Sequence, residues 1–183
     1  MAGNPRRDWA KPVLVVVGGL PATGKSTIGR MVARRAGAGY VRVDTIEQAI
    51  VRFDGAEQVR HAVTWGLGYT VAYAVAGDLL AQGQHVFAEC VNPMRITRDA
   101  WQDVATRHGA QFAEVELVCS DPAEHQRRAT SRTVDIPDLV LPTWQQIVDR
   151  EYEPWHRDHI VLDTAGTAAE DSATVLAGML GVA

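Results

Sequence analysis

The chain has 183 residues, of which 46% are hydrophobic and 22% charged, with a formal net charge of −4 and a pI near 5.8. This composition is typical of one globular domain with a buried core, and its acidic balance argues against a broad basic surface for duplex nucleic acid. No apolar run approaches the roughly 20 residues of a membrane-spanning helix. Cys90 and Cys119 stand in apolar segments, which favours reduced thiols and a cytoplasmic location.

Strand and helix patterns alternate along the chain, which predicts an α/β fold with a five-stranded, mainly parallel sheet flanked by helices. Residues 1–11 predict a flexible leader, and residues 12–183 predict one domain. Apolar runs predict strands at 13–17, 40–43, 85–90, 112–119 and 160–163. Helical spacing predicts helices at 26–35, 45–52, 56–81 and 94–108, with later ones starting near 121, 143 and 167.

Local signals refine several of these helices. Asp121 before Pro122 predicts a cap, and Thr143 with Gln146, and Thr167 with Glu170, fit capping boxes. Within the predicted 56–81 helix, Gly66 and Gly68 indicate a kink or the close approach of another group.

A glycine-rich loop follows the first predicted strand and opens the first predicted helix. It fits the G-x-x-x-x-G-K-[ST] pattern of a Walker A, or P-loop, motif in the context that this motif requires. We expect Lys25 to reach the β- and γ-phosphates of ATP and Ser26 to place its hydroxyl on Mg²⁺. No Asn/Thr-Lys-x-Asp motif for guanine is present, so ATP is the expected nucleotide. The predicted nucleotide-binding residues here are Gly19, Leu20, Pro21, Ala22, Thr23, Gly24, Lys25, Ser26 and Thr27.

A carboxylate, Asp44, ends the second predicted strand. The carboxyl ends of parallel strands line the crevice where ligands bind, so Asp44 is a candidate catalytic base that accepts the proton of the acceptor hydroxyl. The alternative is a helix cap formed by Asp44 or Thr45. Asp44 and its neighbour Thr45 are also predicted to contact the substrate.

Three further candidates come from the middle of the chain. Glu89 ends the third predicted strand, where it either holds Mg²⁺ through water or fixes the loop 90–93. Asn92 lies in that loop and is a candidate substrate contact. Tyr69 shares a helix face with Trp65 and Tyr73; such a stripe is more often core, with a wall of the acceptor pocket as the alternative.

Arginines follow the fourth predicted strand. Arg128 and Arg132 are four residues apart, which predicts that they share a helix face. Directed at the loop, they would neutralise charge on the transferred phosphoryl group, and a solvated basic face is the alternative. With the polar segment 133–141, they predict a mobile lid at about 121–142. Lys25, Asp44, Arg128 and Arg132 are thus the predicted catalytic residues.

The chain resembles small P-loop kinases related to zeta toxin and chloramphenicol phosphotransferase, and the bacterial "AAA family ATPase" kinases. The resemblance rests on residues 18–27, on Val-Asp-Thr-Ile-Glu at 43–47 and on the arginine-bearing helix after 120–122. It implies a nucleoside-kinase-like fold with an arginine lid, Asp44 acting on an acceptor hydroxyl, and Arg128 and Arg132 as lid arginines. It also implies that Thr164 and Gly166 lie near adenine.

The function expected from these features is an ATP- and Mg²⁺-dependent phosphotransferase acting on a hydroxyl of a small molecule, such as an antibiotic, a nucleoside-like or a sugar-like acceptor. Two alternatives stay open. One is a polynucleotide-end kinase, whose basic groove would come from Arg95, Arg98, Arg127, Arg128 and Arg132. The other is a regulatory ATPase without a phosphoryl acceptor. The sequence favours no nucleic-acid or membrane partner and leaves the oligomeric state open.

Overall fold

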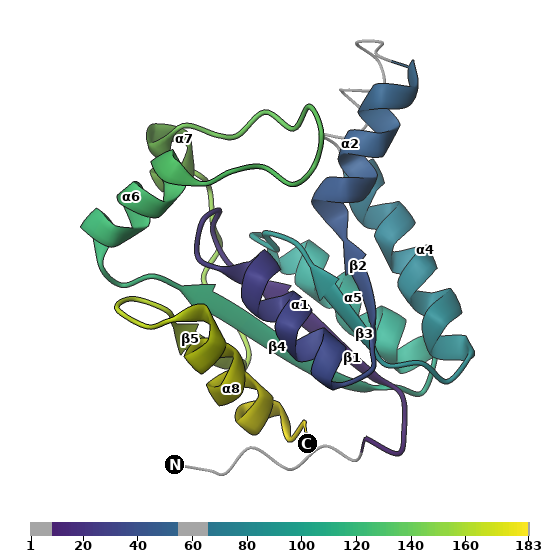
Figure 1. Cartoon of the computed structure of the whole chain (residues 1–183). Coiled ribbons are helices and arrows are strands. Elements are labelled where there is room, and N and C mark those ends of the chain that lie inside the picture. Colours follow the sequence, from purple (N-terminus) through teal and green to yellow (C-terminus); the bar gives the residue numbers. More distant parts are fainter. Residues whose placement is uncertain (1–8, 55–65, 183) are drawn as a thin grey trace.

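One parallel sheet organises the molecule. The computed structural model describes residues 9–54 and 66–182. The sheet has the order β2-β3-β1-β4-β5, and every neighbouring pair is parallel, which confirms the predicted five-stranded α/β architecture (Figure 1). The strands are β1 (Val13–Gly18), β2 (Gly39–Arg42), β3 (Val86–Glu89), β4 (Gln111–Val118) and β5 (Ile160–Asp163).

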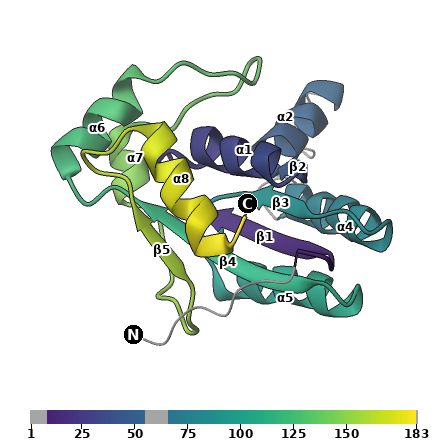
Figure 2. The same cartoon turned by 60° about the horizontal axis from the view of Figure 1, so that its bottom comes forward.

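Helices cover both faces of this sheet, as expected for parallel strands. Helices α1 and α8 lie on one face, and α4 and α5 lie on the other (Figures 1 and 2). Helices α6 and α7 and the segment between them lie over the carboxyl ends of the strands. The helices are α1 (Lys25–Arg35), α2 (Val43–Asp54), α4 (Leu67–Ala81), α5 (Arg95–Arg107), α6 (Pro122–Ser131), α7 (Trp144–Val148) and α8 (Ala169–Leu180).

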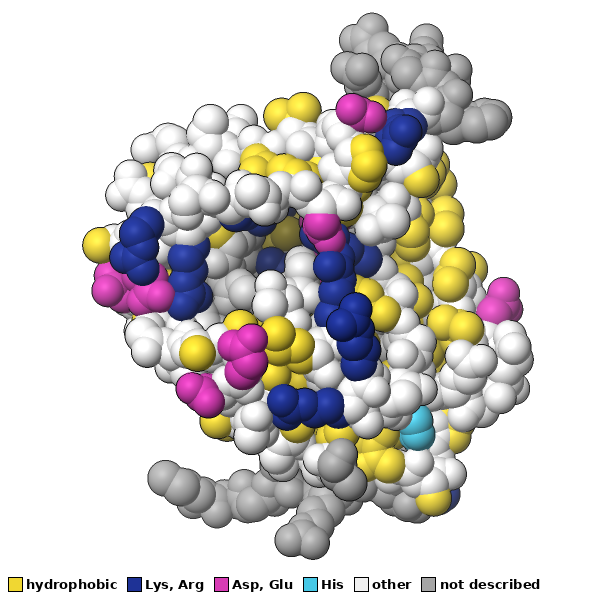
Figure 3. Space-filling model, in the orientation of Figure 1, with side chains coloured by type: hydrophobic (Ala, Val, Ile, Leu, Met, Phe, Trp, Pro, Cys, Tyr) yellow, Lys and Arg dark blue, Asp and Glu magenta, His cyan; other side chains and the backbone are white. Residues whose placement is uncertain are grey.

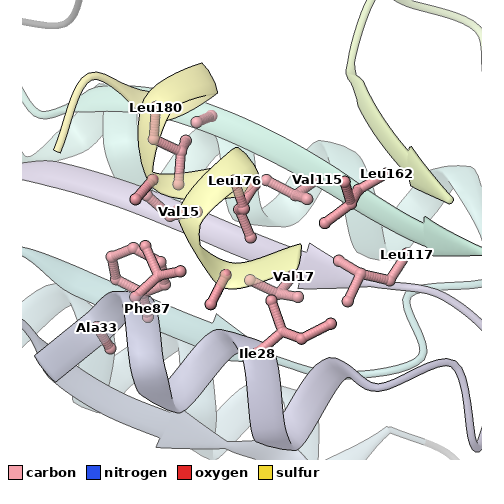
Figure 4. Close-up of a cluster of buried hydrophobic side chains, with 14 of the residues drawn as sticks. Val15, Val17, Ile28, Ala33, Phe87, Val115, Leu117, Leu162, Leu176 and Leu180 are labelled. Atoms are coloured by element: carbon pink, nitrogen blue, oxygen red, sulfur yellow. The ribbon is translucent and has the colours of Figure 1, made fainter. Parts of the chain in front are cut away.

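Strand β1 is the centre of two hydrophobic cores. Its side chains alternate between the faces, so Val15 and Val17 pack with α1 and α8, whereas Leu14 and Val16 pack with α4 and α5. All four are at most 1% exposed. Figure 4 shows the first core, in which side chains of α1 and α8 meet those of β1, β3, β4 and β5. The P-loop therefore starts from the most completely buried strand.

The predicted element boundaries are mostly correct to within two residues. Asp121 caps α6, and Thr143 with Gln146 forms the predicted capping box of α7. The predicted capping box at Thr167 is wrong, because α8 begins one residue later with Ala168 as its N-cap and the Thr167 hydroxyl donates to the Ala165 carbonyl at 3.3 Å.

Within the described residues, the predicted 56–81 helix is observed from Leu67 to Ala81. Helix α4 begins at Leu67, after Gly66 with a φ of 92°, a left-handed conformation that ends regular α-helix geometry. Residues 56–65 of the predicted helix, with Trp65, lie outside the described residues. The described portions contain no helix long and apolar enough to cross a membrane.

The amino-terminal segment predicted as a leader contributes one packed side chain. The Trp9 indole Nε1 donates a hydrogen bond to the Leu180 carbonyl at 3.1 Å, and its ring contacts His85 edge to face at 4.9 Å. Residues 1–8 lie outside the described residues. The packed domain thus includes Trp9, three residues before the predicted domain start.

Arg98 links the loop after β3 to the segment before β5. Its side chain is 0% exposed, and its guanidinium donates hydrogen bonds to four backbone carbonyls at 2.8–3.1 Å. The rings of Tyr152 and Trp155 lie 5.2 and 4.1 Å from it. The carbonyls belong to Asn92, Pro93, Glu153 and Pro154. Because Arg98 is fully buried, it is unavailable for the basic groove that a polynucleotide kinase would need.

We predict that Arg98→Met lowers the free energy of unfolding by at least about 3 kcal/mol, because four backbone carbonyls each lose a hydrogen bond from a buried guanidinium. Urea unfolding measures this change. Arg95→Met is the matched control, since the Arg95 side chain is 65% exposed and an exposed ion pair is worth at most about 1 kcal/mol. Equal urea midpoints for the two variants would contradict the structural role of Arg98.

Candidate active site

The P-loop, residues 19–26, joins the end of β1 to the start of α1. Three of its residues have a positive φ: Gly19 at 127°, Ala22 at 68° and Gly24 at 97°. A side chain at Gly19 would place its Cβ 2.2 Å from the Leu117 carbonyl oxygen, so only glycine fits there. A non-glycine residue in this conformation, such as Ala22, is strained backbone of the kind that clusters at functional sites.

The lysine of the loop is buried beneath it. Lys25 is 8% exposed, and its ammonium group donates to the Leu20 carbonyl at 2.7 Å. Burial lowers the pKa of Lys25, and the carboxylates of Glu89 and Asp44 oppose this shift. The predicted phosphate-binding lysine therefore faces both carboxylates that the sequence singled out.

Ser26 and Glu89 meet at the junction of the two central strands. The Ser26 hydroxyl donates to one Glu89 carboxylate oxygen at 2.5 Å, and the Tyr40 hydroxyl donates to the other at 2.7 Å. The Arg42 Nε lies 3.2 Å from that second oxygen. Glu89 is 3% exposed, so these partners compensate a buried carboxylate. None of these contacts is with the loop 90–93, so they lend no support to the alternative in which Glu89 fixes that loop.

The Ser26 hydroxyl and the adjacent Glu89 carboxylate oxygen are the kind of oxygen ligands that Mg²⁺ takes. The described residues contain no group of three or more His, Cys, Asp or Glu side chains arranged to hold a metal. Mg²⁺ in nucleotide sites needs few such ligands, because water and substrate phosphates complete its octahedron. A P-loop hydroxyl beside a buried carboxylate fits this arrangement, so Ser26 and Glu89 are compatible with the predicted metal site.

Asp44 lies in the first turn of α2, directly after β2. It interacts electrostatically with Lys25 of the P-loop and with Arg132 of the segment beyond α6. Asp44 is therefore close enough to interact electrostatically with both Lys25 and Arg132, although they are 19 and 88 residues away in the chain. Its neighbour Thr45 is exposed on α2.

Asn92 and Tyr69 are joined by a hydrogen bond, and Asn92 is closed to solvent. The Asn92 backbone N–H donates to the Tyr69 hydroxyl at 3.0 Å, and Asn92 is 0% exposed with a φ of 55°. The Thr97 hydroxyl donates to the Asn92 side-chain oxygen at 3.0 Å. The predicted substrate contact through Asn92 is therefore wrong for this conformation, since the side chain is closed to a ligand. Tyr69 packs against the core beside Tyr73.

Arg128 belongs to a different part of the site from Arg132. Its guanidinium donates to the Thr164 hydroxyl at 2.9 Å, to the Thr164 carbonyl at 2.8 Å and to Glu124 at 2.5 Å. Arg128 and Thr164 line a pocket of about 250 Å³ that opens beside the P-loop. The other residues lining it are Ala22, Gly24, Thr27, Ile28, Thr167, Ala169 and Ser172.

The expected shared helix face of Arg128 and Arg132 is wrong. Helix α6 ends at Ser131, and Arg132 has extended backbone with a φ of −68° and a ψ of 142°. Arg132 instead projects near Asp44 and Glu89, whose carboxylates oppose the lowering of its pKa by burial. Arg128 thus faces the pocket beside Thr27, and Arg132 faces the carboxylates.

The segment 132–143, which follows α6 and which we name the lid segment, is held down by ion pairs. Asp135 accepts hydrogen bonds from Arg30 and Arg42, the latter at 2.8 Å. These contacts lower the pKa of Asp135 to about 2. Farther along, Arg52 lies 3.5 Å from Asp138. Figure 3 shows a hollow beneath this segment with Lys and Arg side chains gathered at its sides.

His125 links the lid helices to the P-loop and was missed in the sequence. Its Nε2 lies 2.8 Å from the Pro21 carbonyl oxygen, so Nε2 carries the proton and donates to it. The side chain is 7% exposed, and its ring meets Trp144 of α7 edge to face at 5.1 Å. Local sequence contains no signal for this contact, because 104 residues separate its partners.

Comparison with known proteins places the chain in a family. Residues 14–153 match the family described as AAA domain. The chain belongs to this AAA domain family. A comparison with curated proteins finds no match.

Solved structures share the fold at low sequence identity. A kinase candidate from Chloroflexus aurantiacus is 18% identical, with a TM-score of 0.70 over 93% of this chain and 97% of its own. A gluconokinase from Sinorhizobium meliloti is 18% identical, with a TM-score of 0.64 over 95% and 93%. The Mycobacterium tuberculosis APS kinase CysC, solved with AMPPNP and APS, is 18% identical, with a TM-score of 0.65 over 93% and 98%. The AAA domain chain therefore has a P-loop kinase fold.

We predict that Glu89→Gln raises the Mg²⁺ concentration needed for half-maximal activity by roughly 10-fold, because a carboxylate next to a metal ligand tunes metal affinity. A Mg²⁺ titration at saturating ATP measures this. Tyr40→Phe is the matched control, since it removes a hydrogen bond to Glu89 and keeps the carboxylate; its requirement should change by less than about three-fold. An unchanged requirement in Glu89→Gln would remove Glu89 from the metal site.

We also predict that His125→Ala lowers the melting temperature by about 3–6 °C and raises the KM for ATP about five-fold. The Pro21 carbonyl loses a buried donor worth about 1–2 kcal/mol, and the loop is less firmly held. Thermal unfolding and steady-state kinetics give both values. Gln126→Ala, exposed on the same helix, should match the unsubstituted protein. If both variants behaved alike, His125 would not position the P-loop.

Proposed function

We propose that this protein is an ATP-dependent phosphotransferase that moves the γ-phosphoryl group to a hydroxyl of a small molecule. The observation that carries the proposal is that Asp44, at the start of α2, interacts electrostatically with both Lys25 and Arg132. A carboxylate near both a phosphate-binding lysine and an arginine is suited to act on an acceptor hydroxyl.

On the nucleotide side, the P-loop and α1 hold the phosphates. The backbone of residues 19–24 and the amino-terminal end of α1 surround them, and Lys25 contacts the β- and γ-phosphates. Ser26, with Glu89 next to it, would hold Mg²⁺, and the ion would neutralise negative charge on the phosphates. The adenosine part of ATP occupies the pocket lined by Thr27, Arg128 and Thr164.

On the acceptor side, Asp44 takes the proton of the reacting hydroxyl as the hydroxyl oxygen attacks the γ-phosphorus. Arg132 is half-buried and, among the described residues, makes no ion pair. A guanidinium in this state stabilises negative charge on the transferred group more strongly than a solvated one. Arg128 is bonded to Glu124 and Thr164, so its contribution is nucleotide binding.

The comparisons support a small acceptor. The structures with this fold include a gluconokinase and an APS kinase, whose names denote small-molecule kinases. The nucleic-acid alternative loses support because Arg98 is buried and Arg128 is bonded within its own pocket. A regulatory ATPase remains the competing function, and the presence or absence of a phosphorylated acceptor distinguishes it.

We expect Asp44→Asn to reduce kcat for acceptor phosphorylation by about 10²- to 10⁴-fold, the usual contribution of a general base, with the KM for ATP changed much less. Labelled ATP incubated with a metabolite pool, followed by separation of phosphorylated products, measures transfer. Asp103→Asn, an exposed aspartate on α5, is the matched control. Hydrolysis that no acceptor increases, in the unsubstituted protein, would favour the regulatory ATPase instead.

A further inference from the structure

A second carboxyl group, that of Glu47, follows Asp44 on α2. The two residues are three apart on α2, so they share a helix face with about 5–6 Å between their Cβ atoms. Glu47 is half-buried, and the proposed phosphoryl transfer makes no use of it. It is therefore a carboxyl group near Asp44 without an assigned task.

The neighbouring helix is shaped to receive this side chain. Gly68 of α4 is buried, and a Cβ added there would lie 2.2 Å from the Glu47 Cγ and 2.8 Å from its Oε1. The Glu47 side chain thus lies flat against the backbone of α4. The glycine at position 68, which in the sequence indicated a kink or a close approach, is thus explained by the contact with the Glu47 side chain. A glycine in a helix costs about 1 kcal/mol relative to alanine, and here it makes room for a carboxyl group.

The carboxyl of Glu47 has neighbours but no bonded partner within the described residues. The charged or titratable groups that face it are Asp44 on its own helix, Tyr69 on α4 and Arg150 after α7. Burial first, and then Asp44, raise the pKa of Glu47 to about 7, and Arg150 opposes this. A partly buried polar group without a hydrogen bond destabilises the fold, which is consistent with a group reserved for a ligand.

We propose, building on the phosphotransferase function above, that Glu47 selects a polyhydroxylated acceptor by accepting a hydrogen bond from a hydroxyl adjacent to the one that is phosphorylated. Two carboxyl groups one helical turn apart match two neighbouring hydroxyls, one at Asp44 and one at Glu47. They repel an anionic group at this position. Any acidic group of the acceptor therefore points away from α2, toward Arg132 or Arg150.

The transfer itself involves only the first hydroxyl. Its proton passes to Asp44 while its oxygen forms a bond to the γ-phosphorus. The bond from that phosphorus to the β–γ bridging oxygen breaks, and the electron pair leaves with ADP. Glu47 makes and breaks no covalent bond, so it is a specificity residue, and its removal acts on acceptor binding more than on turnover.

The first experiment compares polyols with their deoxy analogues as acceptors. The probes are D-gluconate, D-glucose, sorbitol and myo-inositol, each paired with an analogue that lacks one hydroxyl next to the phosphorylated position. For a polyol, Glu47→Gln should raise the acceptor KM roughly 10- to 100-fold, the cost of losing a hydrogen bond to a charged group. For the deoxy analogue, the two proteins should have the same KM.

The pH dependence gives a readout that a purely structural role would not move. A carboxylate accepts a stronger hydrogen bond than a neutral carboxyl group, so the acceptor KM of the unsubstituted protein should fall as the pH rises through about 7. Glu47→Gln should lose this inflection, whereas its melting curve and the KM for ATP report on the fold and on the nucleotide side.

Gly68→Ala tests the geometry without changing the charge. The added methyl group would overlap the Glu47 Cγ and displace the carboxyl, so this variant should reproduce the rise in acceptor KM. In a Glu47→Ala background, Gly68→Ala should add no further rise. Gly178→Ala in α8, where a Cβ would meet nothing within 4 Å, is the matched control and should leave the acceptor KM unchanged.

The outcomes separate this inference from the function it builds on. Phosphorylation that depends on Asp44 but uses an acceptor with a single hydroxyl, or an unchanged polyol KM in Glu47→Gln, overturns the role of Glu47 and leaves the kinase function standing. No transfer to any polyol in the panel, with transfer to a different class of hydroxyl, also overturns it. Transfer that survives Asp44→Asn instead overturns the assignment of the base.

Discussion

The site depends on the parallel pairing of β1 with β3. Their register aligns Val17 with Glu89, so the P-loop leaves one strand where the neighbouring strand ends in a carboxylate. Ser26 then meets Glu89 at 2.5 Å. The connection after β1 leads to β2 on one side of β1, whereas the connection after β3 leads to β4 on the other side. The loops therefore separate here and open a crevice, as in other doubly wound sheets. The residues with proposed roles lie around the carboxyl ends of β1 and β3.

Charge balance in the crevice follows from that geometry. Burying Lys25 and Glu89 would be costly for each alone, but each lies in the field of the other. Ser26 and Tyr40 donate hydrogen bonds to Glu89, and Arg42 forms an ion pair with it. Arg42 also binds Asp135, and so joins the metal-side carboxylate to the lid segment. Movement of this segment away from the site would therefore break the ion pair between Asp135 and Arg42, the residue that also pairs with Glu89.

Three polar contacts between distant segments hold α6 and the loops around the site in place. His125 fastens α6 to the P-loop, Arg128 fastens it to the loop after β5, and Arg98 joins the loop after β3 to the chain before β5. Each satisfies backbone carbonyls that would otherwise be buried without a donor. This division explains why arginines that look alike in the sequence differ in their surroundings: Arg98 is structural, Arg128 lines the pocket beside the P-loop, and Arg132 has no ion pair among the described residues.

The sequence alone determined the strands, the P-loop and the positions of Asp44 and Glu89, because these depend on local apolar patterns and on a motif whose spacing is set by phosphate binding. Only the tertiary structure decided which side chains meet across long separations. Three such features depend on how helices pack and on which backbone carbonyls need donors. They are the contact of Glu47 with Gly68, the hydrogen bond of His125 to Pro21, and the end of α6 before Arg132. These contacts form between segments that are distant in the chain, so no local sequence pattern predicts them.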